Sequence, residues 1–259
     1  MKIALILTIL ISTKTLFVQP AWAGPDRIIG ANDLVLVKSD FSNIPTLFKN
    51  SMSAIGKLSS GCTVTHIGQG FVLTAGHCFW QTFFDEKLKL NEKCSDETIQ
   101  WAWTEGTVNP KTSTCLEIVA AQRSDTENFD FAIMKVSNPP SAKINIDWSK
   151  KLRAGAFVTI FSYPEEAPLS WSKYCRTEAV TAKSLFPALM HHVCDTLAGS
   201  SGAAVLDVVT GKIVGLHKSG DGETMEDGTT TPALENYAMF ISQSPIKNIL
   251  IKSGYILKK

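Results

Sequence analysis

The sequence predicts an all-β fold, because its apolar residues fall in short runs rather than in long amphipathic repeats. These runs are rich in β-branched side chains and are bounded by Gly, Pro, Asn or Ser. Short runs with such boundaries are typical of strands. Many of them in succession predict a sandwich or a barrel. The clearest examples are residues 70–74, 131–136, 157–161, 203–206 and 212–216.

One helix is expected at the C-terminal end of the chain. Ser244 can cap it, Pro245 suits its first turn, and Gly254 can end it. Ile246 and Leu250 are four residues apart, so both side chains would lie on the same face of the helix. We therefore expect a surface helix that packs on the β-structure and has no function of its own.

Composition and charge limit the classes of protein to which this chain can belong. It has 259 residues, of which 44% are hydrophobic and 19% are charged, so a folded core is expected. This length suits one compact unit or two small barrels, and the two prolines in the segment 138–141 favour a boundary there. The net charge of +1 gives no electrostatic reason to expect nucleic acid or an anionic membrane as a partner.

The first residues are typical of an export signal. Lys2 precedes the apolar stretch 3–11, and Ala-Trp-Ala at 21–23 fits a signal peptidase site. The alternative is an uncleaved membrane anchor, but the apolar stretch is too short to cross a bilayer. We expect residues 1–23 to be a signal peptide and the mature protein to be secreted or periplasmic, without stable membrane insertion.

Six cysteines follow this segment, and their even number predicts three disulfides in an exported protein. Spacing alone does not choose among the pairings. A zinc site is the alternative, but the chain has no C-x-x-C pair, so no metal is expected. No cofactor is expected either. The cysteines are Cys62, Cys78, Cys94, Cys115, Cys175 and Cys194.

Three segments could together supply a serine nucleophile and the groups that activate it. Peptide hydrolysis by serine needs a hydroxyl, a base that titrates near neutrality, and a carboxylate that orients the base. His77 follows the strand-like run 70–74, and Asp130 lies between two phenylalanines at the start of another run. A carboxylate in such apolar surroundings needs a partner.

Ser201 lies in a turn in which Gly199 and Gly202 permit positive φ. Such a turn can direct the amides of Gly199 and Ser201 at one oxygen and so form an oxyanion hole. The order His, Asp, Ser along the chain is one of the known orders of this triad. An α/β-hydrolase would need the serine first and a Gly-x-Ser-x-Gly segment, and the chain has neither around Ser201.

These segments resemble the histidine, aspartate and serine motifs of trypsin-like (chymotrypsin-fold) serine proteases. The matching segments are Leu-Thr-Ala-Gly-His-Cys at 73–78, Asn-Phe-Asp-Phe-Ala-Ile at 128–133 and Gly-Ser-Ser-Gly at 199–202. The bacterial V8-like, or glutamyl endopeptidase, branch is the most similar. Its Asp-Thr-x-x-Gly-x-Ser-Gly pattern matches 195–202, and its Gly-Tyr-Pro segment matches 162–164 with Ser162 in place of glycine.

The resemblance implies two six-stranded antiparallel β-barrels, at about 28–140 and 141–259, with the helix at the C-terminus. It implies a catalytic triad of His77, Asp130 and Ser201. It also implies three disulfides, namely Cys62–Cys78, Cys175–Cys194 and, with these two in place, Cys94–Cys115.

In glutamyl endopeptidases a threonine and a histidine help to bind the acidic substrate side chain at P1, the residue before the cleaved bond. The corresponding positions here are Thr196 and His217. A hydroxyl and an imidazole can both donate to a carboxylate. The alternative is that both residues are structural. Asp195 lies where trypsin has the carboxylate of its basic pocket, but the V8-like branch has aspartate there too.

The start of the mature chain has two interpretations. Arg-Ile-Ile-Gly at 27–30 resembles an activation junction, so residues 24–27 would be a short propeptide and Ile28 the mature N-terminus. The alternative is that Gly24 is the N-terminus. Trypsin pairs its new N-terminus with an aspartate directly before the serine, and Ser200 cannot replace that aspartate.

The sequence as a whole predicts a secreted serine endopeptidase that acts on proteins or peptides, as a monomer, through an acyl-enzyme. Glu or Asp is the expected P1 residue. The alternative is a non-catalytic homologue that serves as a binding or toxin-like module, because fold does not imply function.

Overall fold

The computed structural model describes residues 28–79, 88–94, 96–124, 128–179, 187–220 and 235–257. The expected signal peptide, the segment 24–27 and its Arg27 lie outside these ranges. No helix in the described ranges is long and apolar enough to cross a membrane.

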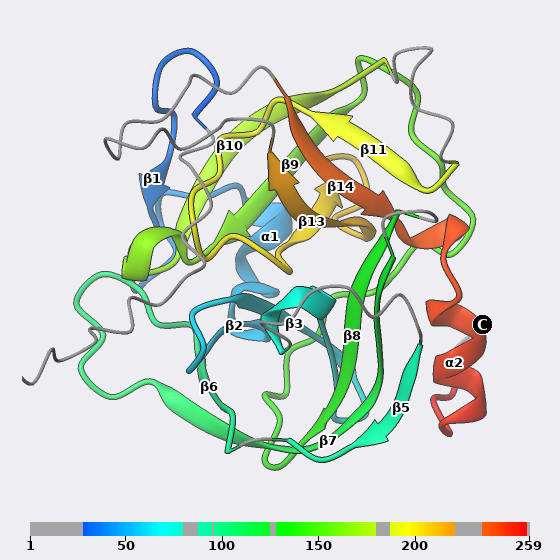
Figure 1. Ribbon diagram of the computed structural model, residues 1–259. Coiled ribbons are helices and arrows are strands. Elements are labelled where there is room, and N and C mark those ends of the chain that lie inside the picture. Colours follow the sequence, from blue (N-terminus) through cyan, green and yellow to red (C-terminus); the bar gives the residue numbers. More distant parts are fainter. Residues whose placement is uncertain are drawn as a thin grey trace, which may run out of the picture.

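The first barrel is a closed antiparallel sheet of six strands (Figure 1). Its strands pair in the order β7-β6-β2-β3-β4-β8, and the pairing of β7 with β8 closes the ring. The short strand β5 (Lys89–Glu92) is added outside the ring, on β7. The six strands are β2 (Ile55–Leu58), β3 (Thr63–Gly68), β4 (Phe71–Thr74), β6 (Thr98–Trp101), β7 (Lys111–Ser124) and β8 (Phe129–Val136).

The second barrel repeats this plan in the second half of the chain. The order is β10-β11-β14-β13-β12-β9, and the pairing of β10 with β9 closes the ring. The strands are β9 (Phe157–Ser162), β10 (Ser170–Glu178), β11 (Leu189–His192), β12 (Ala204–Asp207), β13 (Ile213–Gly220) and β14 (Asn236–Phe240). The predicted pair of six-stranded antiparallel barrels is therefore confirmed.

Helices are short and lie between or after the strands. The C-terminal helix α2 (Ile246–Lys252) is confirmed, with Pro245 rather than Ser244 in the N-cap position. The Ser244 hydroxyl still accepts from the first helical amide, that of Ile246, at 3.4 Å, and it donates to the Ile241 carbonyl at 2.8 Å. Gly254, with φ 87°, follows the helix as expected. The other helices are α1 (Thr46–Lys49) and the 3₁₀ turns η1 (Met52–Ala54), η2 (Gly76–Cys78), η3 (Pro164–Glu166) and η4 (Ile241–Gln243).

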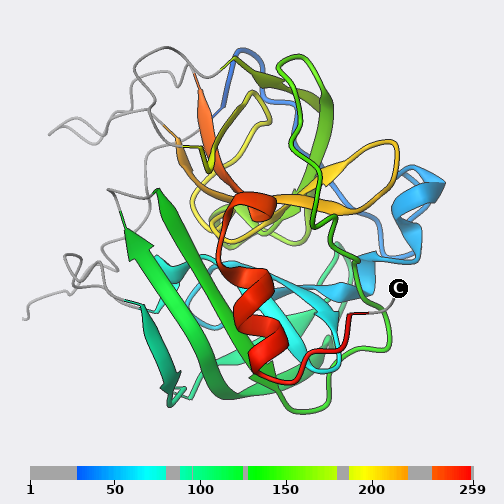
Figure 2. The ribbon, with the colours of Figure 1, turned by 90° about the vertical axis from the view of Figure 1, so that its right-hand side faces the viewer.

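Each end of the described chain lies against the barrel of the other half. Strand β1 (Val35–Leu36) pairs with β10 of the second barrel. The terminal helix α2 lies beside the first barrel, as both views show (Figures 1 and 2). After this helix, the Tyr255 hydroxyl donates to the Ile67 carbonyl at 2.8 Å, and its ring meets Phe71 edge-on. These crossed ends join the two barrels.

The hydrophobic core has three parts. One fills the first barrel and includes Val64 and Met134, and another fills the second barrel around Val158 and Val214. The largest part includes side chains from both barrels, and in it the rings of Phe48 and Phe161 lie 5.5 Å apart. Strands buried on both faces lose the alternation of apolar and polar residues, which explains the continuous apolar runs of the sequence.

The three disulfides have the predicted pairing: Cys62–Cys78, Cys94–Cys115 and Cys175–Cys194. Cys62–Cys78 joins the start of β3 to η2, and Cys175–Cys194 joins β10 to the segment that follows β11. Each bridge closes a loop of 16 to 21 residues and limits the freedom of the unfolded chain.

Full reduction is therefore expected to destabilise the fold. A lost native disulfide costs about 2–5 kcal/mol in a small secreted domain, so the melting temperature should fall clearly in reductant. Calorimetry with and without reductant, together with a count of free thiols, measures the effect. An unchanged melting temperature in a sample with six free thiols would contradict this stabilising role.

Candidate active site

His77 is the middle residue of η2, directly after β4. Its ring lies beside Asp130 of β8, and β8 pairs with β4 in the same barrel. His77 Nδ1 is 2.7 Å from one carboxylate oxygen of Asp130, and the His77 amide donates to the other oxygen at 3.0 Å. Two bonds thus fix both the ring and the backbone of the histidine against one carboxylate.

This contact determines which ring nitrogen of His77 can act as a base. A carboxylate only accepts hydrogen bonds, so Nδ1 carries the proton and Nε2 is left to accept one. Burial by itself would raise the pKa of the Asp130 carboxyl. The charge of His77, its hydrogen bonds and the charge of Lys218 more than offset this, and the pKa lies below its usual value. Asp130 is therefore ionised at neutral pH.

Ser201 lies in the turn between β11 and β12, which belong to the second barrel. The Thr63 amide of the first barrel donates to the Ser201 carbonyl at 3.0 Å. The next residue, Gly202, has φ 82°, and a Cβ there would lie 2.7 Å from the Ala75 amide nitrogen. Only glycine fits this close approach. The turn therefore lies directly against the residues that precede His77.

The structure thus places Ser201 and His77 at the same junction of the barrels, on facing segments. Within the described residues, Ser201 Oγ makes no hydrogen bond to His77. Such bonds are often long in the absence of substrate and shorten when it binds.

The amides expected to form the oxyanion hole belong to peptide groups whose carbonyls are anchored. The Ala198 carbonyl accepts from the Glu165 amide at 2.6 Å, and the Ser200 carbonyl accepts from the Ala203 amide at 3.0 Å. In a trans peptide the N–H points away from the C=O, so both anchors orient the next amide, at Gly199 and at Ser201. No hydrogen bond within the described ranges uses either of these two amides.

Thr63, on β3 of the first barrel, holds this turn and the residue after β9 of the second barrel. Its buried hydroxyl donates to the Gly199 carbonyl at 2.8 Å and accepts from the Tyr163 amide at 3.0 Å. Gly199 has φ 92°, and a Cβ there would lie 3.1 Å from the Gly61 carbonyl oxygen, so the backbone is tightly enclosed. No sequence motif pointed to Thr63, because its partners lie 100 and 136 residues away.

Replacing Thr63 with valine should lower kcat about tenfold and leave KM nearly unchanged. The change removes the hydroxyl that fixes the Gly199 peptide, and loss of a single oxyanion donor costs about 10²–10³ in kcat. Thr65→Val is the matched control, because Thr65 is buried on the same strand and its hydroxyl has no partner among the described residues. A Thr63→Val protein that stays folded and keeps its kcat would contradict this role.

Two departures from the family pattern meet in space. Ser162, which replaces the glycine of the Gly-Tyr-Pro segment, has its hydroxyl 2.9 Å from that of Ser200. The Ser200 hydroxyl also accepts from the Leu197 amide at 3.2 Å. Ser200 is fully buried, so this pair braces the turn from behind, at the place where trypsin has its buried aspartate.

Asp195 is bound by the N-terminal segment. Its two oxygens accept from the amides of Ile29 at 2.9 Å and of Asp33 at 2.6 Å. Asp33 also pairs with Lys173 at 2.8 Å. Burial raises the pKa of the Asp195 carboxyl, and these two amides reduce the increase. Because both oxygens are occupied by backbone, Asp195 is a poor receptor for a basic substrate side chain.

Thr196 and His217 are both buried, with exposed fractions of 0% and 2%. The Thr196 hydroxyl has no hydrogen-bond partner among the described residues. His217 lies on β13 beside the nucleophile turn, since its carbonyl accepts from the Gly202 amide at 2.9 Å. The Lys218 ammonium binds the side chain of Asn128, two residues before Asp130, so it contacts the aspartate segment.

One cluster has the composition of a metal site. The ligand atoms of Cys62, His77 and Cys78 lie within 4.8 Å of one another. However, the two sulfurs are joined as a disulfide and cannot act as thiolate ligands.

Comparison with known proteins identifies the family. Residues 59–216 match the model of the trypsin-like peptidase domain, which is more than half of the 259 residues. The chain belongs to the trypsin-like peptidase family. No curated protein sequence matches this peptidase significantly.

Solved structures with the same fold include a Glu endopeptidase in complex with MPD. It has a TM-score of 0.62 and 18% identity, and the match covers 87% of this peptidase and 98% of that chain. An inactive serine-to-alanine mutant of Rv3671c from M. tuberculosis H37Rv has a TM-score of 0.55 and 15% identity, and the match covers 89% of this peptidase and 98% of that chain. Another structure of the Rv3671c protease in an inactive form has a TM-score of 0.54 and 14% identity, and the match covers 85% of this peptidase and 98% of that chain.

Proposed function

We propose that this trypsin-like peptidase is a secreted serine endopeptidase with His77, Asp130 and Ser201 as its triad. The observation that carries the proposal is the two-bond contact of His77 with Asp130, next to the turn of Ser201. In this mechanism His77 Nε2 takes the proton from the Ser201 hydroxyl as the oxygen attacks the peptide carbonyl. Asp130 stabilises the imidazolium that forms.

The amides of Gly199 and Ser201 would receive the charge that develops on the carbonyl oxygen of the substrate. Their orientation by anchored carbonyls favours this role, since a preorganised donor pays no reorganisation cost during the reaction. His77 then donates its proton to the leaving amine. In the second half of the reaction His77 takes a proton from water as the water attacks the acyl-enzyme, and returns it to the Ser201 oxygen.

The proposed preference is for Glu or Asp at P1. The buried Thr196 hydroxyl without a partner supports this, because a buried donor that lacks a bond costs free energy unless a ligand supplies one. The imidazole of His217 is the second proposed donor. Asp195 does not oppose an acidic side chain in this proposal, because backbone amides already bind both its oxygens.

Export and processing belong to the same proposal. Three disulfides are typical of a protein from an oxidising compartment, which agrees with the export signal expected at 1–23. Cleavage after Arg27 would leave the ammonium of Ile28 next to the amide that binds Asp195. The mature peptidase would then start at Ile28 and act as a monomer on protein or peptide substrates.

Cleavage of a peptide library tests the proposal, with proteins that start at Ile28 or Gly24 and Ser201→Ala as the control. Cuts that need Ser201 and fall after Glu or Asp support both the triad and the pocket. Cuts that need Ser201 but fall elsewhere refute the acidic preference. If a folded, disulfide-bonded protein with either start cuts nothing, the alternative of a non-catalytic binding module replaces the proposal.

A further inference from the structure

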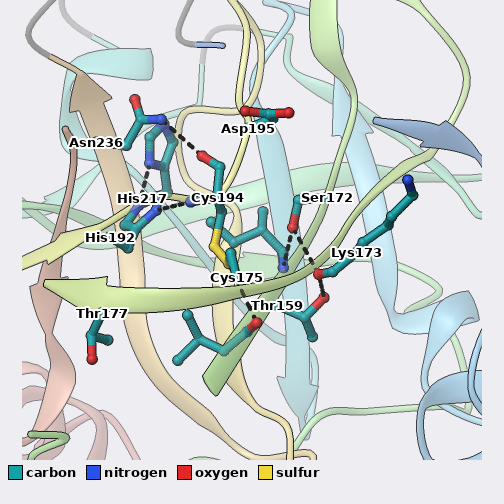
Figure 3. The surroundings of a disulfide bond; sticks show 12 residues. Thr159, Ser172, Lys173, Cys175, Thr177, His192, Cys194, Asp195, His217 and Asn236 are labelled. Carbon is teal, nitrogen blue, oxygen red and sulfur yellow. Dashed lines mark hydrogen bonds between the residues drawn. A yellow bond between two sulfur atoms is a disulfide. The ribbon is translucent and has the colours of Figure 1, made fainter. Parts of the chain in front are cut away.

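His192 is a fully buried histidine in contact with His217, one of the two proposed specificity residues. It ends β11, and Figure 3 shows its ring between the backbone of Cys194 and the ring of His217. The Cys194 amide donates to His192 Nδ1 at 3.2 Å, and His192 Nε2 is 3.1 Å from His217 Nδ1. Nearby, the Asn236 side chain donates to the Cys194 carbonyl at 2.8 Å, so the amide and the carbonyl of Cys194 both have hydrogen-bond partners.

The Cys194 amide determines the tautomer of His192. An amide N–H can only donate, so His192 Nδ1 must be unprotonated. A neutral imidazole has one proton, and in His192 it must therefore be on Nε2, where it is directed at His217 Nδ1. His217 Nδ1 is consequently an acceptor, and the proton of its neutral ring is on Nε2. The chain of bonds runs from Cys194 through His192 to His217.

The same series of hydrogen bonds opposes a positive charge on His217. A protonated His217 would carry a hydrogen on Nδ1, facing the hydrogen of His192 Nε2. His192 cannot relieve this clash by moving its proton to Nδ1, because the Cys194 amide occupies that side. Burial, together with the charge of His191, lowers the pKa of His192 to about 3, so His192 stays neutral at ordinary pH.

The titratable and charged groups on the surrounding elements have their own partners. On β11, His191 binds Glu235, the residue before β14, at 2.5 Å. In the turn that follows β11, Asp195 binds the N-terminal segment. On β13, Lys218 binds Asn128. Among these groups, the structure shows a hydrogen bond from His192 to the His217 ring.

We propose that His192 is a positioning residue that keeps His217 as a neutral Nε2–H donor, so the specificity pocket recognises an acidic side chain with uncharged donors. The inference rests on the proposed preference for Glu or Asp at P1. Its consequence is that selectivity for Glu over Gln at P1 does not follow a histidine titration. An imidazolium pocket would instead favour Glu more strongly as the pH falls.

Nuclear magnetic resonance tests the proton positions without any need for activity. The sample is Ser201→Ala protein with ¹⁵N-labelled histidine, followed from pH 5.5 to 8. We expect both His192 and His217 to remain neutral with the proton on Nε2 throughout. A proton on His192 Nδ1, or a protonated His217 in this range, would overturn the inference even if proteolysis had never been detected.

Kinetics test the effect on selectivity. We expect the wild-type ratio of kcat/KM for Glu and Gln at P1 to change less than about twofold between pH 5.5 and 8. In His192→Leu, the donor that faces His217 Nδ1 is removed and this nitrogen can take a proton, so the ratio should rise about tenfold toward low pH, since a charged donor adds roughly 1.4 kcal/mol. His192→Gln keeps a donor toward His217 and should restore the flat profile.

His191→Phe is the matched control, because His191 lies on the same strand but binds Glu235 instead of His217. It removes only the smaller cause of the low pKa of His192 and keeps the burial of His192 and its bond to His217. This variant should keep the wild-type profile. A tenfold change in the wild type, or a flat profile in folded His192→Leu, would refute the role of His192. A wild type with no preference for Glu would refute the proposed specificity instead, and the proton positions would still decide the inference.

Discussion

Ser201→Ala should lower kcat by about 10⁴- to 10⁶-fold in steady-state assays with a cleavable peptide. The alanine leaves no nucleophile for an acyl-enzyme. The turn itself should be unaffected, because its contacts are made by the backbone of Ser201 and by Ser200. The melting temperature should therefore stay within about a degree or two of the wild type.

The matched control is Ser200→Ala, which removes the neighbouring hydroxyl and its bond to Ser162. This variant should lose stability, because Ser162 is buried and loses its partner, while most of the activity remains. His77→Ala should reduce kcat about as much as Ser201→Ala, and the double variant should lose little more, because the two residues act as one unit. Additive losses, or normal rates in either single variant, would refute the triad.

The proposed triad was predicted from local patterns in the sequence. His77 follows a strand within a disulfide-clamped turn, and Ser201 lies between glycines that permit positive φ. Asp130 was predicted to need a partner because its carboxylate lies between phenylalanines, and in the structure it contacts His77. Barrel closure could be expected only through the resemblance to the family, since strand pairing across the chain has no local signal.

The remaining parts depend on contacts between distant segments. Thr63 braces the serine turn from the other barrel, and its neighbours in the sequence give no hint of that role. Glu165 has φ 46°, a conformation that glutamate rarely adopts, and the sequence around it does not predict this. The partner of His192 lies 25 residues away, and the tautomer depends on a backbone amide.

Replacing Asp130 with asparagine should lower kcat by about 10⁴-fold at neutral pH. The amide group of asparagine presents donors where the carboxylate accepted from both the ring and the backbone of His77. If its NH₂ group faces the ring, His77 Nδ1 becomes the acceptor and the proton moves to Nε2. The base would then point its proton at Ser201 and could not receive one, and the imidazolium would lose its neutralising charge.

The comparison for this variant is Asp147→Asn, in the connection between the barrels. Asp147 also accepts backbone amides, those of Ser149 and Lys150, at 3.1 Å each, but it does not contact His77. This control should keep its kcat. Measurement of the His77 tautomer in Asp130→Asn by ¹⁵N resonance would tie the loss of rate to its cause. If Asp130→Asn retained a tenth of the activity with the Nε2–H tautomer present, orientation of the base by Asp130 would not limit the rate.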